Sequence, residues 1–325
     1  MDFETPKENY SGKIIEVTIG ATPEEGGTRS HTITIGGSTS PPFHFFEGKH
    51  PHPPRVAMEV FDKVPNKYPH SLMEYYRDVI EKPADMAKKC VEQYGAELIS
   101  VRLEGTHPEK GNKSADEAAG IVRQILESVK VPVIITGHSH FEKINEVIKK
   151  VCEITAGENC LINYVETDNY KTIAASCIAY NHTIVAQSPI DVNLGKQLNI
   201  LLTDMSFPAE RIVMDPLTST LGYGLEYTYS IMERIRNDGL AGDKMLAFPM
   251  LINPGYESAV VKEARASIED NPDWGDQELR CAYWEIATAM SLLASGAELL
   301  IIYHPKAVEV VKNKISEIFN SKKGS

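Results

Sequence analysis

The sequence offers little from which a disulfide-bonded or membrane-bound framework could be built. Its 325 residues include five cysteines, and no two of them form a CxxC pair. An odd and scattered set predicts neither disulfides nor a self-contained zinc or iron–sulfur site. No stretch approaches the roughly 20 apolar residues of a membrane span, and the polar start MDFETPKENY predicts no signal peptide. We therefore expect a cytoplasmic protein.

Several short motifs of nucleotide-binding and metal enzymes are also missing. No GxGxxG follows an apolar run, and there is neither a Walker A motif nor an HExxH, which argues against dinucleotide, P-loop and zinc-protease chemistry. The formal net charge is −12. An acidic chain repels nucleic acid and anionic membranes, so we expect neither as a partner.

From Arg55 onward, short apolar runs alternate with amphipathic stretches. The expected strands are 56–61, 98–103, 131–136, 161–165, 183–187, 211–214, 245–252 and 298–303. The expected helices are 85–94, 115–129, 141–155, 170–180, 194–205, 226–238, 277–294 and 307–319. Near-continuous apolar runs are typical of parallel strands buried on both faces. The pattern predicts an α/β fold, a (β/α)₈ TIM barrel over residues 55–325, with an open doubly wound sheet as the alternative.

The first 54 residues have a different pattern. Lys13–Gly20 and Ser30–Gly37 alternate apolar and polar residues, and two adjacent glycines lie between them, which indicates a β-hairpin. The loop SPPFHFFEGKHPHPP follows, and its prolines exclude a regular helix. Its three phenylalanines need cover, from this chain or from a partner. We expect residues 1–54 to pack on the barrel within a single domain.

The strand ends of such a barrel are where function collects, and here they are polar without forming a recognisable catalytic set. Three histidines, His107, His138 and His304, fall on different loops. A three-histidine metal site is conceivable, but histidines that simply satisfy the rim are the better interpretation. We expect no catalytic residue and no metal ligand in this chain.

The most specific local feature is the loop after the sixth strand, DPLTSTLGYGLEY at 215–227. Its glycines permit close backbone approach to a ligand, and its hydroxyls and the following helix start can bind polar groups. A well-made strand-to-helix turn is the alternative interpretation.

Longer motifs give the chain a resemblance to a known family. The motifs are EVFD at 59–62, MDPLTSTLGYGLEYTYSIMERIR at 214–236, AFPMLINPGYESAV at 247–260 and WGDQELRCAYWEIATAMSLLASGAELLIIYHPKAV at 274–308. They resemble the small subunit of the corrinoid/iron–sulfur protein of acetogens and the delta subunit of the archaeal acetyl-CoA decarbonylase/synthase complex. The similarity runs along nearly the whole chain.

The resemblance implies a methyl carrier of the Wood–Ljungdahl (reductive acetyl-CoA) pathway. In that family a small barrel subunit pairs with a large subunit that holds a [4Fe–4S] cluster, and a corrinoid (a B12-type cobamide) lies between them. The cobalt takes a methyl group from methyltetrahydrofolate through a methyltetrahydrofolate:corrinoid methyltransferase and delivers it to carbon monoxide dehydrogenase/acetyl-CoA synthase. The implied role is helping to hold the corrinoid, without independent catalysis. The residues expected to contact it are Thr218, Ser219, Thr220, Leu221, Gly222, Tyr223, Gly224, Tyr303 and His304.

Two other functions stay open. The chain is also similar to pterin-binding barrels, and Asn163 and Asp215 are candidate remnants of a pterin site. It would then be a pterin-dependent methyltransferase acting on a corrinoid protein. The remaining alternative is an assembly scaffold that touches no cofactor.

Overall fold

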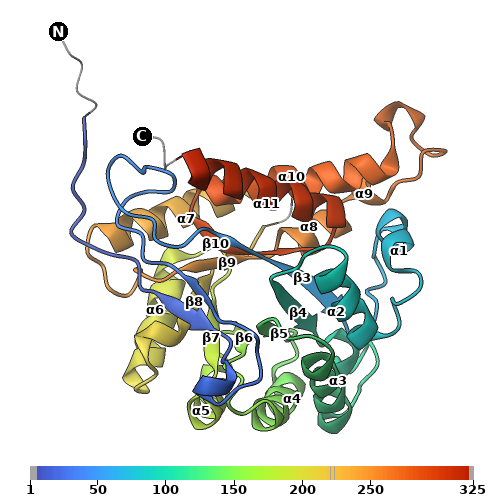
Figure 1. The fold of residues 1–325 in the computed structure, drawn as a ribbon, viewed down its shortest axis with the longest axis horizontal. Coiled ribbons are helices and arrows are strands. Elements are labelled where there is room, and N and C mark those ends of the chain that lie inside the picture. Colours follow the sequence, from blue (N-terminus) through green and yellow to red (C-terminus); the bar gives the residue numbers. More distant parts are fainter. Residues whose placement is uncertain (1–5, 220, 223, 322–325) are drawn as a thin grey trace.

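The fold is a closed barrel of parallel strands surrounded by helices (Figure 1). The computed structural model describes residues 6–219, 221–222 and 224–321. Neighbouring strands follow the order β10-β3-β4-β5-β6-β7-β8-β9. Their bounds are β3 (Arg55–Phe61), β4 (Leu98–Arg102), β5 (Val133–Thr136), β6 (Leu161–Val165), β7 (Thr183–Gln187), β8 (Ile212–Asp215), β9 (Met250–Ile252) and β10 (Ala297–Ile302). The predicted TIM barrel is confirmed, and the doubly wound alternative is wrong because the sheet closes.

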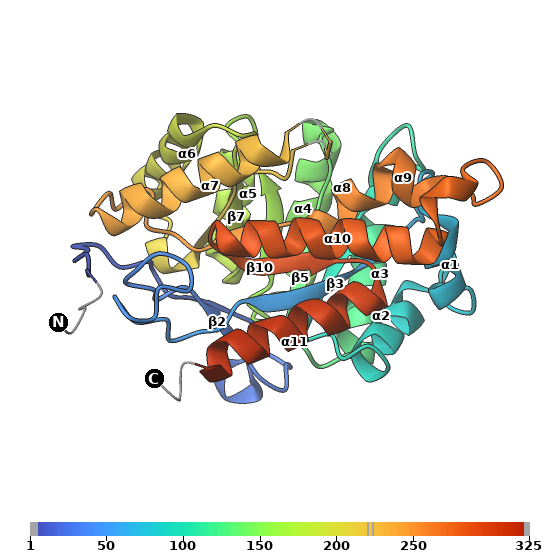
Figure 2. The ribbon, with the colours of Figure 1, turned by 90° about the horizontal axis from the view of Figure 1, so that it is seen from above.

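Helices cover the outside of the barrel, and α10 and α11 lie side by side over β10 (Figure 2). Eight helices match expected ones: α2 (Pro83–Glu92), α3 (Ala115–Ser128), α4 (Phe141–Ile154), α5 (Tyr170–Tyr180), α6 (Val192–Asp204), α7 (Leu225–Leu240), α10 (Gln277–Ala294) and α11 (Pro305–Ser321). Three short helices, α1 (His70–Tyr76), α8 (Pro254–Val260) and α9 (Lys262–Arg265), were not expected. Short 3-10 turns add η1 (Pro23–Glu25), η2 (Glu104–Thr106), η3 (Ala209–Arg211) and η4 (Pro272–Trp274).

The seventh barrel strand is shorter than its apolar run predicts. The run 245–252 suggested eight residues, whereas β9 has only Met250–Ile252. Pro249 accepts a hydrogen bond from Met214 of β8 at 2.9 Å but has no N–H to donate to the ladder. Just before it, the Ala247 carbonyl accepts a hydrogen bond from Ile15 at 2.8 Å. The first part of the run is therefore bound to the N-terminal segment instead of to the sheet.

The N-terminal hairpin closes the end of the barrel where the strands begin. Strands β1 (Val17–Ile19) and β2 (Ile33–Ile35) pair antiparallel, as predicted, and their apolar residues join the main core. The Gly20 amide donates to the Asn159 carbonyl, just before β6, at 2.9 Å. The hairpin thus covers the barrel at the amino ends of its strands, here called the lower end. The opposite end, where the strands finish, is not covered by it.

The aromatic loop between the hairpin and the barrel is covered mainly by this chain. Phe45 packs edge-on against Phe319 of α11, with ring centroids 5.2 Å apart, and Phe43 packs against the core. Phe46 remains 49% exposed. The loop is therefore fastened to α11 and leaves one phenylalanine on the surface.

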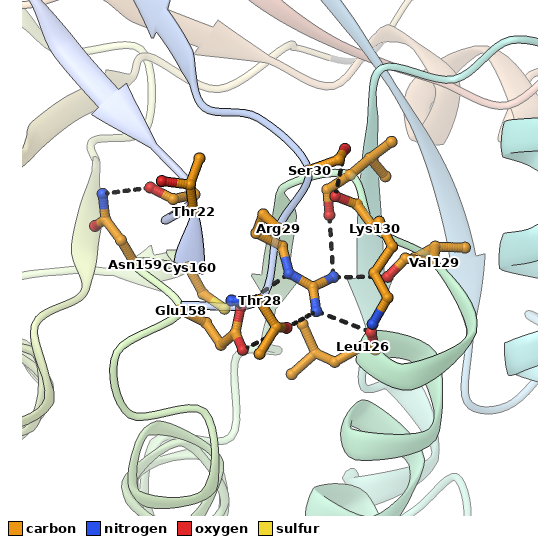
Figure 3. A network of polar contacts seen from close by, with 12 residues as sticks. Thr22, Thr28, Arg29, Ser30, Leu126, Val129, Lys130, Glu158, Asn159 and Cys160 are labelled. Carbon is orange, nitrogen blue, oxygen red and sulfur yellow. Dashed lines mark hydrogen bonds and ion pairs between the residues drawn. The ribbon is translucent and has the colours of Figure 1, made fainter. Parts of the chain in front are cut away.

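Arg29 is the main polar anchor of the hairpin (Figure 3). Its side chain is buried and its Nε lies 2.8 Å from a carboxylate oxygen of Glu158. Its terminal nitrogens donate to the carbonyls of Leu126, Val129 and Val131 at 2.8, 2.8 and 3.3 Å. These carbonyls lie at the end of α3 and the approach to β5, so one guanidinium connects the hairpin to two loops of the barrel.

We predict that Arg29→Met lowers the free energy of unfolding by about 3–5 kcal/mol, because it leaves the Glu158 carboxylate without its partner in a buried place. The matched control is Lys13→Met, which breaks an ion pair with Glu16 whose side chains are 56% and 41% exposed. That loss should cost at most about 1 kcal/mol. Urea unfolding of both variants measures the difference. Equal costs would show that the hairpin does not depend on Arg29.

Candidate functional site

A cavity of about 170 Å³ opens at the carboxyl ends of the barrel strands. This is the end of a (β/α)₈ barrel at which ligands bind. Its lining comes from the barrel strands and the loops after them: Arg102, Glu104, His107, Lys110, Thr136, His138, Ser139, Asn163, Tyr164, Gln187, Asp215, Leu217, Thr218, Asn253, Tyr256 and Glu257. Almost every side chain in this set carries a polar group. The barrel mouth is therefore a polar cavity.

One side of the cavity presents hydrogen-bond acceptors. Asp215 ends β8 and is only 4% exposed. Its Oδ1 accepts the Leu217 amide at 2.8 Å, but its Oδ2 has only a 3.4 Å contact with the Gln187 side-chain nitrogen. The Gln187 Oε1 and the Thr218 hydroxyl are buried without a protein partner. Because buried polar atoms are normally paired, these groups mark a place for a ligand with hydrogen-bond donors.

Burial also affects the protonation state of the Asp215 carboxyl group on this side of the cavity. Desolvation raises the pKa of Asp215 to about 7, while the hydrogen bond from Leu217 and the charge of Arg102 counteract part of the rise. Asp215 therefore changes charge near neutral pH. A carboxyl group with such a pKa responds readily to a donor placed against it.

The other side of the cavity holds a fixed positive charge. The Arg102 Nε donates to Glu59 at 2.7 Å, and the guanidinium lies over the Tyr256 ring at 4.7 Å. Glu59 is itself held by Ser100 at 2.8 Å and by the Tyr303 hydroxyl. Burial alone would lower the pKa of Arg102, but the charge of Glu59 and the hydrogen bond to it, together with Tyr303 and Glu104, more than offset this effect, so the arginine stays charged. Arg102 can stabilise a ligand carbonyl or anion there.

The histidines of the rim do not form a metal site with His304. His107 and His138 stack edge-on with ring centroids 5.0 Å apart, and His138 Nε2 contacts the Thr106 hydroxyl at 2.9 Å. Burial lowers the pKa of His138 to about 4, which leaves it neutral at pH 7. His304 packs instead against Tyr75, away from this cavity. Across residues 6–219, 221–222 and 224–321, no group of three or more His, Cys, Asp or Glu side chains could hold a metal ion.

The residues predicted to contact a corrinoid do not all lie on one surface. Thr218 lines the cavity, whereas Ser219 and Leu221 are buried and do not line it. Gly222 has a φ of +87°, and a Cβ placed on it would meet no atom within 4 Å, so its backbone faces open space. Gly224 precedes the first turn of α7. Thr220 and Tyr223 lie outside the described residues.

Of the two predicted contact residues after β10, Tyr303 points into the barrel, whereas His304 packs against Tyr75 of α1. The Tyr303 hydroxyl bonds Glu59 inside the barrel, and its backbone amide donates to Glu285 at 2.6 Å. His304 is fully buried and donates its amide to the same carboxylate at 2.8 Å. Their role toward a corrinoid stays a prediction, and their visible role is to shape the barrel's open end.

The grouping of Arg102, Asn163, Gln187 and Asp215 was not predicted as a site. The sequence singles out two of these four residues, Asn163 and Asp215, as candidate remnants of a pterin site. Only the closed barrel shows that they line one cavity. Their placement at the ends of strands was the signal that could have grouped them.

Solved structures of low sequence identity share the fold. The dihydropteroate synthase of Xanthomonas albilineans with 4-aminobenzoic acid superposes with a TM-score of 0.56, at 14% identity over 82% of this chain and 93% of that one. The dihydropteroate synthase of Coxiella burnetii in complex with pteroic acid also gives 0.56, at 12% identity over 86% and 97%. These likenesses establish the TIM-barrel fold.

Sequence relatives are much closer. The subunit delta of the acetyl-CoA decarbonylase/synthase complex from Archaeoglobus fulgidus is 40% identical over 98% of this chain and 70% of its own length. The subunit delta from Methanocaldococcus jannaschii is 34% identical over 100% of this chain and 78% of its own. The sequence profile of the CO dehydrogenase/acetyl-CoA synthase delta subunit matches residues 16–313. The chain therefore belongs to the family of CO dehydrogenase/acetyl-CoA synthase delta subunits.

Proposed function

We propose that this chain is the barrel subunit of a corrinoid methyl carrier in the reductive acetyl-CoA pathway. The observation that carries the proposal is the 34–40% identity to delta subunits of acetyl-CoA decarbonylase/synthase complexes over nearly the whole chain. A large subunit with a [4Fe–4S] cluster, a methyltransferase that charges the corrinoid and the acetyl-CoA synthase that receives the methyl group are the partners of this proposal.

The cysteines of this chain suit a division of labour in which the cluster is held elsewhere. All five are free and buried. Burial raises the pKa of Cys90, Cys160 and Cys281 to about 12, so these thiols stay protonated at neutral pH. An iron–sulfur cluster needs several thiolates at one place. We therefore assign the cluster to the partner.

The loop after β8 is the part of this chain that fits a corrinoid. Gly222 offers backbone without a side chain in the way, and Tyr227, in the first turn of α7, is 61% exposed. A corrinoid is a flat ring edged with amide side chains, and it supplies the cobalt that carries the methyl group. Exposed backbone and an aromatic side chain can bind the edge of such a ring. In this proposal the loop holds the edge while the partner supplies the rest of the site.

The Gly222→Val variant should fold but hold less corrinoid. Valine is disfavoured at a φ of +87° and would fill the open space over the backbone. Losing one good contact costs about 1–3 kcal/mol, or roughly 5- to 150-fold in affinity. The visible spectrum of the purified heterodimer gives the corrinoid occupancy. Gly26→Val is the matched control, because Gly26 has a φ of +91° and open space at the other end of the barrel. Equal occupancy in both variants would show that the loop is only a turn.

Stable pairing with the large subunit is a second expectation. Exposed aromatic side chains are typical of interface centres, and Tyr227 is the most exposed large apolar side chain among the described residues. Light scattering of the co-expressed subunits should show a heterodimer, not the 36.0 kDa chain alone. Tyr227→Asp should weaken pairing, while Tyr283→Asp, on α10 and 58% exposed, should not. The opposite result would place the interface elsewhere.

A second candidate function is a pterin-dependent methyltransferase, and the barrel-mouth cavity favours it. The side-chain oxygens of Asp215 and Gln187 can accept hydrogen bonds from two adjacent N–H groups of a ring ligand, and Arg102 can bind the carbonyl of that ring. A pterin carries these groups on one edge. The dihydropteroate synthase of Coxiella burnetii, which shares the fold, is described in complex with pteroic acid. The isolated chain would then transfer the methyl group of methyltetrahydrofolate to reduced free cobalamin, and turnover in that assay tests the candidate.

The pH dependence of pterin binding gives a further test. Ring N–H donors bind a carboxylate better than a carboxylic acid, and burial raises the pKa of Asp215 to about 7 in the empty cavity. The affinity for 6-methylpterin should therefore fall as the pH drops below this pKa, by up to about tenfold per pH unit. Asp215→Asn should bind weakly and without this pH dependence. Titration calorimetry measures both. A flat profile for the parent protein would mean that Asp215 does not contact the ring.

A further inference from the structure

The turn that follows β8 is fixed at both of its ends. Leu217 has a φ of +65°, in the left-handed region that a leucine rarely adopts. Its amide donates to Asp215 Oδ1 at 2.8 Å, and its carbonyl accepts the Thr228 hydroxyl of α7 at 3.2 Å. The same hydroxyl accepts the Ser219 amide at 2.9 Å. An unfavourable backbone conformation persists only where its surroundings hold it, and here Asp215 and Thr228 hold it.

Asp215 belongs to this turn and to the cavity at once. While Oδ1 accepts the Leu217 amide, Oδ2 has only the 3.4 Å contact to Gln187, and Asp215 lines the cavity. Leu217 and Thr218 line the same cavity, and the Thr218 hydroxyl is buried without a partner. The carboxylate therefore has one oxygen committed to the backbone and one available to a ligand.

We propose that Asp215 couples the barrel-mouth cavity to the turn at Leu217–Ser219, so that a planar ring donating N–H groups to its free oxygen tightens this turn and the start of α7. The coupling rests on the cavity being a ligand site, as the second candidate function requires. It concerns the backbone that leads into the loop after β8, and it does not depend on which protein carries out methyl transfer.

The physical basis is the charge on the carboxyl group. In the empty cavity burial favours the protonated acid, with Arg102 opposing and Glu166 reinforcing this tendency. Donors placed against Oδ2 favour the carboxylate. Hydrogen bonds from a backbone amide to a carboxylate are stronger than those to a neutral acid. A ligand at Oδ2 therefore strengthens the Leu217 bond at Oδ1 and stabilises the strained turn.

Amide hydrogen exchange with 6-methylpterin as the probe tests this coupling. At about one pH unit below the pKa of Asp215 of about 7, where the free parent protein is mostly protonated, saturating pterin should slow exchange of the Leu217 and Ser219 amides by roughly five- to tenfold, the value of one strengthened hydrogen bond. Lumazine is the comparison ligand: it keeps the ring N3–H but has a carbonyl acceptor where pterin has the 2-amino donor, so it tests whether that amino group contacts the carboxylate. It should neither bind well nor slow these amides.

Three variants separate the parts of the proposal. Asp215→Asn should lose both pterin affinity and the slowed exchange. Asp191→Asn is its matched control, because Asp191 accepts the amides of Asn193 and Leu194 at the start of α6, outside the cavity. It should behave as the parent protein does. Thr228→Val should keep pterin affinity within about twofold, because it leaves Asp215 intact, but lose the slowed exchange at Ser219.

The outcomes distinguish failure of the coupling from failure of the second candidate function. Pterin that binds the parent protein without slowing Leu217 and Ser219 overturns the coupling alone. Equal effects of pterin and lumazine also overturn it, because the 2-amino donor that distinguishes the two rings would then make no contact with Asp215. Absence of pterin binding to the parent protein overturns both. If Asp215→Asn does not fold, as judged by circular dichroism, Thr228→Val still decides the matter through the contrast between affinity and exchange.

Discussion

The buried carboxylate of Glu59 is the point at which the open end of the barrel is fixed. It lies on β3 and accepts hydrogen bonds from Ser100 and Arg102 on β4 and from the Tyr303 hydroxyl after β10. The Asn253 amide approaches it at 3.5 Å from the end of β9. A buried charge is tolerated only when paired and hydrogen-bonded. Glu59 meets that condition because side chains on β4, after β10 and at the end of β9 surround its carboxylate.

Much of the site follows from this arrangement. The Ser100 hydroxyl also contacts Thr136 on β5 at 3.1 Å, which extends the network to a further strand. Glu285 of α10 fixes the backbone of Tyr303 and His304, so the helix outside the barrel sets where the Tyr303 hydroxyl lies inside it. Arg102 is thereby held under the Tyr256 ring before any ligand arrives. The cavity is pre-organised on its cationic side, while its acceptor side retains atoms without partners.

The sequence predicts the barrel well because its strands are buried on both faces. Runs such as 56–61 and 161–165 are mostly apolar with a single polar or charged residue each, a pattern typical of buried parallel strands. The short helix α1 (His70–Tyr76) was missed because it buries only Leu72 and Tyr76 and has too few turns to show a period. The start of β9 was also mispredicted, because the apolar run continues on both sides of Pro249, whereas the strand begins only at Met250. Local patterns thus predict the long elements and miss those whose limits depend on distant contacts.

The site is harder to predict for the same reason. The bonds from Glu59 to Arg102 and Tyr303 join residues 43 and 244 positions apart. Asp215 and Asn163 could be noticed as strand ends, but the unpaired oxygen of Gln187 and the left-handed backbone of Leu217 have no signature in the sequence. The residue type at position 217 does not reveal its left-handed backbone conformation, which becomes evident only in the folded turn.

The hairpin that seals the lower end of the barrel bears on how the chain is made. Its anchor Arg29 binds Glu158, which lies 129 residues later in the sequence. The Ser11 hydroxyl donates to the carbonyl of Ala241, 230 residues later. The N-terminal segment is therefore synthesised before its partners: Arg29 must await Glu158, and Ser11 must await the carbonyl of Ala241. Contacts of such large sequence separation form slowly, because a long loop must close before they are gained. We expect closure of the lower end to come late in folding, with the apolar faces of β1 and β2 exposed until then and available to chaperones.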